Sequence, residues 1–199
     1  MLLAIDTSAG TSVALVDREA GILALAESDD PRGHAELVGE LIARCIEGID
    51  VTTLSGVVAG MGPGPFTGLR VGIAAARAFA FGIGRPVVPV ASHDALAWGV
   101  DEPIVVTTDA RRREVFWSAY SGLDAAGIPV RTHGPSLAPA GGAGLPGHRL
   151  VQAHAVSAAH LGLLAEALSA NGRSFAADQP LYLRSPDVTP SAGPKRVTG

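Results

Sequence analysis

The chain has 199 residues, of which 47% are hydrophobic and only 17% are charged, and its formal net charge at pH 7 is −4. A chain of this length buries roughly 70% of the surface that its unfolded form exposes, so it can build its own core, and the low share of charged residues indicates that some apolar surface faces a partner. The negative charge and an aromatic content of 5% argue against a protein that binds RNA on its own, because such proteins carry a basic face and aromatic stacking platforms.

The single cysteine and the N-terminal residues bear on the cellular compartment in which the protein is expected. Cys45 alone cannot form an internal disulfide or a cysteine-type zinc site. The opening MLLAIDTS has no basic segment, and its apolar run ends at Asp6, so no signal peptide is predicted. The longest apolar segment is interrupted by Arg70, Arg77 and Arg85 and falls short of the ~18 residues that a membrane span needs. We therefore expect a cytoplasmic protein that makes no use of a membrane.

The first half of the chain alternates strand and helix signals. Leu2–Ile5 and Val13–Val16 predict two strands joined by a turn of small polar residues, and GILALAES from Gly21 predicts a third. Apolar residues at three- and four-residue steps predict a helix over 34–49, and a second helix is predicted over 67–83 after a Gly/Pro loop. The remaining predicted elements are a strand from Gly56, a strand in PVVPV, and a short helix in SHDALAWG with Ser92 as its N-cap.

The second half begins with the same pattern as the first. The segment IVVTTDARRREVFWSAY again predicts strand, Asp, turn and strand, so that Asp109 corresponds to Asp6. This correspondence favours an internal duplication, although two unrelated hairpins would leave the same trace. Residues 121–149 are rich in Gly and Pro and predict at most short strands. A final helix is expected to end at Asn171–Gly172, and 185–199 has no periodicity and is expected to be disordered.

The two Asp hairpins are candidate nucleotide-binding elements. An Asp beside small hydroxyl residues can hold Mg²⁺ through water while backbone N–H groups face phosphates. The alternative is that these residues only satisfy a tight turn. In the second hairpin, the arginines of 111–113 crowd the place of the phosphate. The residues of this candidate vestigial nucleotide site are Asp6, Thr7, Ser8, Gly62, Gly64, Thr67 and Asp109.

The Gly/Pro loop GMGPGPFTGLR resembles a phosphate-binding loop, because it is rich in glycine and opens a helix whose N-terminus attracts anions. It lacks the Gly-Lys-Ser/Thr ending that places a lysine on the β- and γ-phosphates, and Pro63 and Pro65 remove two N–H donors. A rigid turn that positions the next helix, with Thr67 as the helix cap, explains the loop equally well.

The two long helices are candidates for a partner interface. In the helix over 67–83, two rows at four-residue spacing consist mostly of Gly and Ala, which lets another helix approach closely. A helix that is apolar on nearly every side is buried on more than one side. One side can rest on the sheet, and the other needs either the helix over 34–49 or a second protein. We favour a helical bundle shared with a second protein. The predicted interface residues are Leu37, Leu41, Arg44, Cys45, Gly72, Ala74, Arg77, Ala78 and Phe81. Cys45 also fits simple core packing.

The sequence offers no recognisable catalytic or metal-binding set. His34 would need a histidine at position 38 for a His-x-x-x-His pair, and Val38 stands there. The other histidines are scattered, and there is no Gly-x-Ser-x-Gly elbow. We therefore expect neither a catalytic residue nor a metal.

Five segments together resemble the TsaB (YeaZ) family. In chain order they are LLAIDTSAGTSVALVD, HAELVGELI, GVVAGMGPGPFTGLRVGIAAARAFA, TTDARRREVFWSAY and PLYLR, of which the block GPGPFTGLRVG is the most specific. The resemblance covers most of 2–120 and departs from the family at Pro65, where a Ser is usual. It implies an α/β, actin-like (ASKHA, ribonuclease H-like) fold of two lobes, the first over 1–100 and the second, reduced one over 101–184, followed by the tail over 185–199.

The same resemblance implies a non-catalytic subunit. Such a subunit activates a TsaD-like catalytic paralogue by forming a heterodimer, joined by a TsaE-like ATPase, and threonylcarbamoyl is transferred to N6 of adenosine 37 in tRNAs that read ANN codons. The chain would then meet tRNA only indirectly, form a homodimer when alone, need no cofactor of its own, and meet ATP or ADP only at the junction with its partner. The alternative is a small ATP-dependent phosphotransferase or ATPase of the actin-like fold, built on Asp6 and Asp109.

Overall fold

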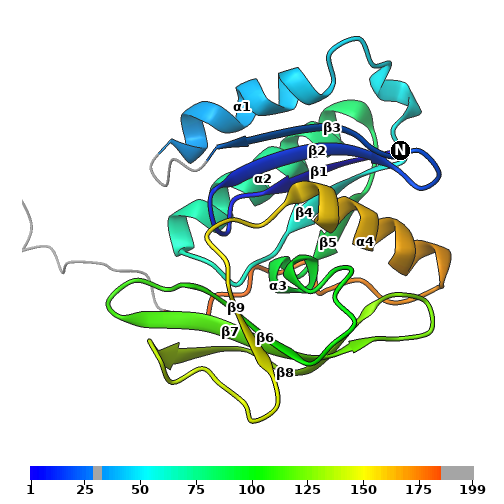
Figure 1. Cartoon of the computed structure of the whole chain (residues 1–199). Helices are drawn as coiled ribbons and strands as arrows, with labels where there is room; N and C mark the ends of the chain where they lie inside the picture. Colours follow the sequence, from blue (N-terminus) through cyan, green and yellow to red (C-terminus); the bar gives the residue numbers. More distant parts are fainter. Residues whose placement is uncertain (29–32, 185–199) are drawn as a thin grey trace, which may run out of the picture.

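Two mixed β-sheets form the frame of the molecule (Figure 1). The computed structural model describes residues 1–28 and 33–184, so the predicted disorder over 185–199 lies outside the described residues. The strands of the first sheet, in spatial order, are β3 (Gly21–Ser28), β2 (Thr11–Asp17), β1 (Leu2–Asp6), β4 (Gly56–Gly60) and β5 (Val87–Val90). Those of the second sheet are β8 (Pro129–Pro139), β7 (Glu114–Leu123), β6 (Ile104–Asp109) and β9 (Arg149–Gln152).

The two sheets repeat one topology. In each sheet, three consecutive strands form an antiparallel meander, and the next strand pairs parallel to the first of the three, β4 beside β1 and β9 beside β6. Asp6 pairs with Ser12 at the end of the first hairpin, and Asp109 pairs with Val115 at the end of the second. The shared topology favours the internal duplication over a coincidence of two hairpins.

Helices cover both faces of the first sheet. The helices α1 (His34–Cys45) and α2 (Phe66–Ile83) lie on one face and α4 (Ala158–Ala170) on the other, while α3 (Ser92–Leu96) lies between the two sheets (Figure 1). A short 3-10 helix, η1 (Val51–Thr53), precedes β4. Every residue of β1 is buried, because alternate side chains of the strand join the core on opposite faces. This two-sided burial explains why the sequence of β1 is a continuous apolar run up to Asp6.

Three helix ends differ from the prediction. α1 ends at Cys45 instead of continuing to 49, because the chain turns at Gly48 with a φ of 73°. α2 begins one residue earlier than expected, so Thr67 lies inside its first turn and is not the N-cap. α3 begins at Ser92 itself, so Ser92 is not an N-cap either. Both hydroxyl residues are therefore released from the capping role that the sequence suggested.

The prediction of at most short strands over 121–149 is wrong. β8 has 11 residues, and it pairs with β7 despite shifts of register along the pair. β8 is an edge strand of the second sheet. An edge strand accepts prolines such as Pro135, because one side of its backbone has no hydrogen-bond ladder to complete.

α4 follows the second sheet in the chain and packs on the first sheet. Leu161 and Leu164 are fully buried in the core that contains the β1 and β2 side chains of this face. Gly162 allows a close approach, since a Cβ there would lie 2.7 Å from a methyl carbon of Val16. The range 101–184 therefore supplies both the second sheet and a covering layer of the first.

The sequence analysis expected no apolar segment long enough to span a membrane, but α2 meets that length. With 18 residues and a mean hydropathy of 1.3, this helix is long and apolar enough to cross a membrane, although it contains Arg70 and Arg77. A single helix of this kind is weak evidence for a membrane span, because the core helix of a soluble protein meets the same criteria. In this fold, 33% of the helix is buried inside the chain.

Candidate functional site

The carboxylate of Asp6 is buried at the end of β1 and is held by two serines. Its Oδ1 accepts hydrogen bonds from the backbone N–H of Ser8 at 2.8 Å and from the Ser8 hydroxyl at 2.6 Å, and its Oδ2 accepts one from the Ser92 hydroxyl at 2.5 Å. The Ser92 oxygen accepts a hydrogen bond from the N–H of Gly62 at 2.9 Å. Burial raises the pKa of the Asp6 carboxyl, and the hydrogen bonds from Ser8 and Ser92 offset only part of that rise. One carboxylate thus joins the first hairpin, the Gly/Pro loop and α3.

The Gly/Pro loop packs directly on the turn of the first hairpin. Gly62 and Gly64 are buried, and a Cβ at Gly64 would lie 2.8–2.9 Å from backbone and side-chain atoms of Ser8. A Cβ at Gly60 would overlap the Asp6 carboxylate. These contacts leave no gap between Ser8 and the loop, two parts of the candidate nucleotide site.

Thr7 fixes α2 on the same turn. Its Oγ1 donates a hydrogen bond to the carbonyl of Gly68 at 2.6 Å and accepts one from the N–H of Gly72 at 2.9 Å. Gly72 has to be a glycine for this approach, because a Cβ would collide with the Thr7 hydroxyl. We call Asp6, Thr7, Ser8 and Ser92 the Asp6 hub. The hub is a joint that sets the position of α2.

Besides Gly62 and Gly64, which contact the hub, two predicted residues of the nucleotide site lie outside it. Asp109 is exposed, and its Oδ1 accepts a hydrogen bond from the N–H of Arg111 at 2.9 Å, so it caps its own turn. Thr67 is exposed on α2. Within the described ranges 1–28 and 33–184, no hydrogen bond or ion pair joins Asp109 to the Asp6 hub, and no three His, Cys, Asp or Glu side chains are grouped to hold a metal.

An extended C-terminal segment, residues 173–184, runs from the Gly/Pro loop to the second hairpin, and we call it the strap. The N–H of Leu181 donates to the carbonyl of Met61 at 2.8 Å, beside the Gly/Pro loop. Three residues later, the Arg184 guanidinium donates to the carbonyl of Ala110 at 2.7 Å and pairs with Glu114 at 3.1 Å, at the second hairpin. The strap therefore links the Gly/Pro loop to the second hairpin.

One side of α2 is exposed to solvent. We call this side the α2 outer face and define it by Arg70, Ala74, Arg77, Ala78 and Phe81, all of which are exposed. Phe81 is 89% exposed, far more than any other large hydrophobic side chain that the structure describes. A nearly bare phenyl ring beside two alanines is the kind of surface that a partner covers.

The structure removes three residues from the predicted interface. Leu41 and Cys45 are each 3% exposed and belong to the core between α1 and the first sheet, where the Cys45 thiol donates to the carbonyl of Val13 at 3.2 Å. Gly72 is buried against the Asp6 hub. The helical periodicity of the sequence identified apolar positions without showing which of them the chain's own sheet would cover. Of the remaining α1 residues, Leu37 is half-buried and Arg44 is exposed.

The strap forms one rim of the α2 outer face. The Arg70 guanidinium lies 3.8 Å from the ring centroid of Phe66 and donates to the Tyr182 hydroxyl at 3.1 Å. The Tyr182 and Phe66 rings lie 4.8 Å apart, and Arg77 pairs with Asp178 at 2.7 Å. Sequence patterns missed this rim, because its contacts join positions about a hundred residues apart.

A second buried polar cluster links α3 to the second sheet, and the sequence analysis did not predict it. The ring nitrogens of His93 lie 2.9 Å from the Ser118 hydroxyl and 3.0 Å from the Thr108 hydroxyl. Burial lowers the pKa of His93 to about 3, so this ring is neutral. Next to it, Asp94 accepts a hydrogen bond from the Tyr120 hydroxyl at 2.7 Å.

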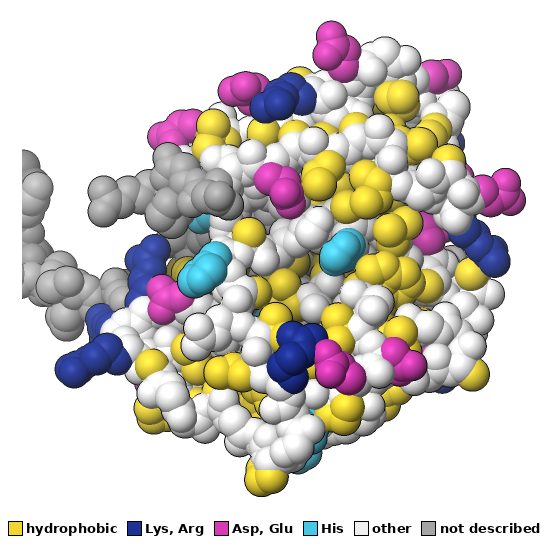
Figure 2. Space-filling model, in the orientation of Figure 1, with side chains coloured by type: hydrophobic (Ala, Val, Ile, Leu, Met, Phe, Trp, Pro, Cys, Tyr) yellow, Lys and Arg dark blue, Asp and Glu magenta, His cyan; other side chains and the backbone are white. Residues whose placement is uncertain are grey.

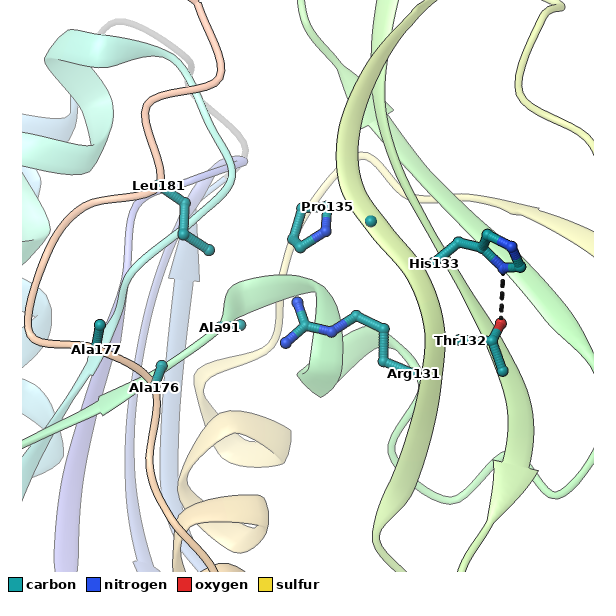
Figure 3. A pocket seen from close by; sticks show the side chains of 9 residues that line it. Ala91, Arg131, Thr132, His133, Pro135, Ala176, Ala177 and Leu181 are labelled. Carbon is teal, nitrogen blue, oxygen red and sulfur yellow. Dashed lines mark hydrogen bonds between the residues drawn. The ribbon is translucent and has the colours of Figure 1, made fainter.

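A hollow of about 320 Å³ lies between β8 and the strap. Figure 3 shows that the Arg131 side chain points into this space beside Ala91 and Ala176, while His133 points away from it. The Arg131 Nε lies 3.6 Å from the Asp94 carboxylate. The guanidinium therefore belongs to the link between α3 and the second sheet.

Comparisons with known proteins match a TsaD family model and relatives named TsaB and YeaZ. The family model described as TsaD, tRNA N6-adenosine threonylcarbamoyltransferase, matches residues 27–128. An uncharacterized protein of Mycobacterium tuberculosis is 39% identical over 96% of this chain and 95% of its own length. The tRNA threonylcarbamoyladenosine biosynthesis protein TsaB of Haemophilus influenzae is 35% identical over 59% of this chain and 52% of its own length. The solved structure of YeaZ from Pseudomonas aeruginosa superposes with a TM-score of 0.76 at 26% identity, covering 92% of this chain and 99% of that one.

Proposed function

Because the chain belongs to the TsaB (YeaZ) family, with its actin-like α/β fold, we propose that it serves threonylcarbamoyladenosine synthesis on tRNA as a non-catalytic subunit. In this role it docks a TsaD-like catalytic paralogue through the α2 outer face. The observation that carries the proposal is Phe81, which stands 89% exposed next to Ala74 and Ala78 on a helix anchored from behind by the Asp6 hub.

The shape of the α2 outer face supports a close helix-to-helix contact. Ala74 and Ala78 are one turn apart and have no bulk, so a partner helix can approach the α2 backbone, and Phe81 then fills a pocket on the partner. A stable interface buries about 1,200–2,000 Å² in total. The strap rim at Tyr182 and Asp178 enlarges the surface beyond the helix itself.

The expected partners and ligands fit around this docking mode. A TsaE-like ATPase would join the pair, and in the absence of either partner the same face would pair with a second copy about a two-fold axis. ATP or ADP would bind only at the junction with the paralogue, in the cytoplasm. The filled contact between Ser8 and Gly64 supports a role without a nucleotide held by this chain alone.

The test is a binding measurement between the purified chain and the TsaD-like paralogue from the same cell. Phe81→Ala removes the anchor, and Ala78→Arg places an unpaired charge inside the contact. We expect each variant to weaken binding by at least about tenfold, in line with the loss of a buried aromatic anchor. Ala170→Arg, at the exposed end of α4, is the matched control and should bind normally. Wild-type affinity in both α2 variants, with folding intact, would refute docking through this face.

A further inference from the structure

The tip of the β6–β7 hairpin has an unusual backbone. Between the two strands, Arg111, Arg112 and Arg113 are all exposed, and all three take left-handed φ values of 62°, 53° and 62°. This conformation crowds the Cβ against the following carbonyl oxygen, so residues other than glycine adopt it singly and rarely in a run. Glycine would relieve the strain at each position. Strained backbone of this kind is typical of functional sites, which makes the three arginine side chains the feature to explain.

The strained tip is also firmly held. The N–H of Arg111 donates to the Asp109 carboxylate at 2.9 Å, and the carbonyl of Arg111 accepts from the N–H of Glu114 at 3.0 Å. The carbonyl of Arg113 accepts from the N–H of Ala140, just beyond β8, at 2.8 Å. The backbone is therefore fixed from both sides, and the arginines project from a rigid frame. A rigid frame lowers the entropic cost of binding.

The local charge at this tip is opposite to the charge of the whole chain. The neighbouring acids are Asp109, which caps the turn, and Glu114, which pairs with Arg184 of the strap at 3.1 Å. Within residues 1–28 and 33–184, no carboxylate forms an ion pair with Arg111 or Arg113. Figure 2 shows arginine side chains, in dark blue, gathered at this end of the second sheet. Since charges act over about 8 Å at physiological salt, the net charge of −4 does not decide what binds here.

Arginine clusters of this kind recognise phosphate. A guanidinium donates two parallel hydrogen bonds to phosphate oxygens, and contacts to successive phosphates need no base sequence. We infer that the arginines of 111–113 bind the phosphate backbone of the tRNA substrate. The inference rests on the proposed function, which brings tRNA to the complex, and it replaces the expectation that the chain meets tRNA only indirectly. An acidic protein is the weaker alternative, because a protein interface needs an apolar centre and the tip exposes only arginines.

The test is the salt dependence of binding to an unmodified tRNA transcript, measured by fluorescence anisotropy on the full chain, alone and with the TsaD-like paralogue. The hairpin variant is R111Q/R112Q/R113Q. The control variant, R18Q/R149Q/R173Q, removes an equal number of positive charges at exposed positions elsewhere in the chain. The hairpin variant should bind at least about tenfold more weakly, with a log–log salt slope smaller by about two, since each phosphate contact contributes about 0.7–0.9 to that slope. The control should stay close to the wild type.

Three results would overturn the inference. They are equal losses in both variants, no tRNA binding by the wild type alone or with the paralogue, and hairpin-dependent binding of poly-glutamate in place of tRNA. Thermal unfolding of both variants checks that the fold is intact. Docking of the hairpin variant to the paralogue is measured in parallel and should be unchanged, because the tip lies outside the α2 outer face. Loss of tRNA binding with normal docking thus separates this inference from the proposed function.

Discussion

Replacing Ser92 with alanine tests whether the Asp6 hub is a structural joint. The Ser92 hydroxyl donates to the Asp6 carboxylate at 2.5 Å and accepts from the N–H of Gly62 at 2.9 Å, and all three groups are buried. The substitution removes a hydrogen bond to a carboxylate, worth about 1.5–3 kcal/mol, and leaves a buried N–H without its partner, which costs about 1–3 kcal/mol. We expect the free energy of unfolding to fall by about 3–5 kcal/mol, a large share of the 5–15 kcal/mol typical of a domain.

The pH dependence of this loss follows from the raised pKa of Asp6. An acid whose pKa is higher in the folded state than its ordinary value of 3.8 destabilises the fold as it ionises, so its contribution to stability falls as the pH rises from 3.8 through the folded value. Removing the Ser92 hydroxyl takes away a hydrogen bond that lowers this pKa, so the pKa rises further. The difference between wild type and Ser92→Ala should therefore be smallest below pH 3.8 and grow toward neutral pH.

Urea unfolding followed by circular dichroism at several pH values measures both effects. Ser157→Ala is the control, because Ser157 also lies at the start of a helix, immediately before α4, and makes no side-chain cap hydrogen bond. The control should lose less than about 0.5 kcal/mol, as a substitution away from any special contact does. If Ser92→Ala costs no more than Ser157→Ala, or if its cost does not change with pH, the Asp6 carboxylate does not depend on Ser92 and the joint is misassigned.

Two further predictions concern the hairpins. Arg113→Gly should raise the free energy of unfolding by about 0.5–1 kcal/mol, seen as a higher Tm, because glycine adopts the φ of 62° without a Cβ clash. The same change at Arg44 inside α1 should instead cost about 1 kcal/mol, and a loss of stability at Arg113 would show that the tip is not strained. Isothermal titration of the isolated chain with Mg-ATP should give no binding in the micromolar range, since Gly64 packs directly on Ser8; micromolar binding with turnover would restore the phosphotransferase alternative.

Local patterns predicted most of the first sheet, because its signals lie within short stretches of chain. The apolar run that ends at Asp6 and the Gly/Pro loop before α2 both fold as their residues indicate. The second half was harder to predict. β8 contains Pro129, Pro135 and Pro139, which read as loop residues in isolation, and only its position at the edge of the sheet makes them acceptable. Edge position is a property of the topology and is not visible in a short window.

The candidate site shows the same limit at the level of side chains. The sequence placed Asp6 in a turn with small hydroxyl residues, and that part is confirmed. The second partner of the carboxylate, Ser92, lies 86 positions away and was expected to cap a helix. On α1, the periodicity that identified Leu41 and Cys45 could not distinguish the face against the chain's own sheet from a face against another protein. Burial in the assembled fold decides that question.

Under the proposed function, the Asp6 hub supplies the rigidity that a docking subunit needs. A carboxylate, two hydroxyl groups and a glycine-rich loop are the groups that would surround Mg²⁺ and phosphate, and here they bind one another through Ser8 and Ser92. If a ligand occupied the space between these groups, the position of α2 would depend on that ligand. Here the hydrogen bonds between Thr7 and α2 fix the helix within the chain itself. The strap then connects the rim of the α2 outer face to the second hairpin through Arg184. A partner on α2 and an RNA backbone on the hairpin tip would therefore be held at a set distance by one frame, which is what the proposed non-catalytic subunit would contribute to its enzyme partner.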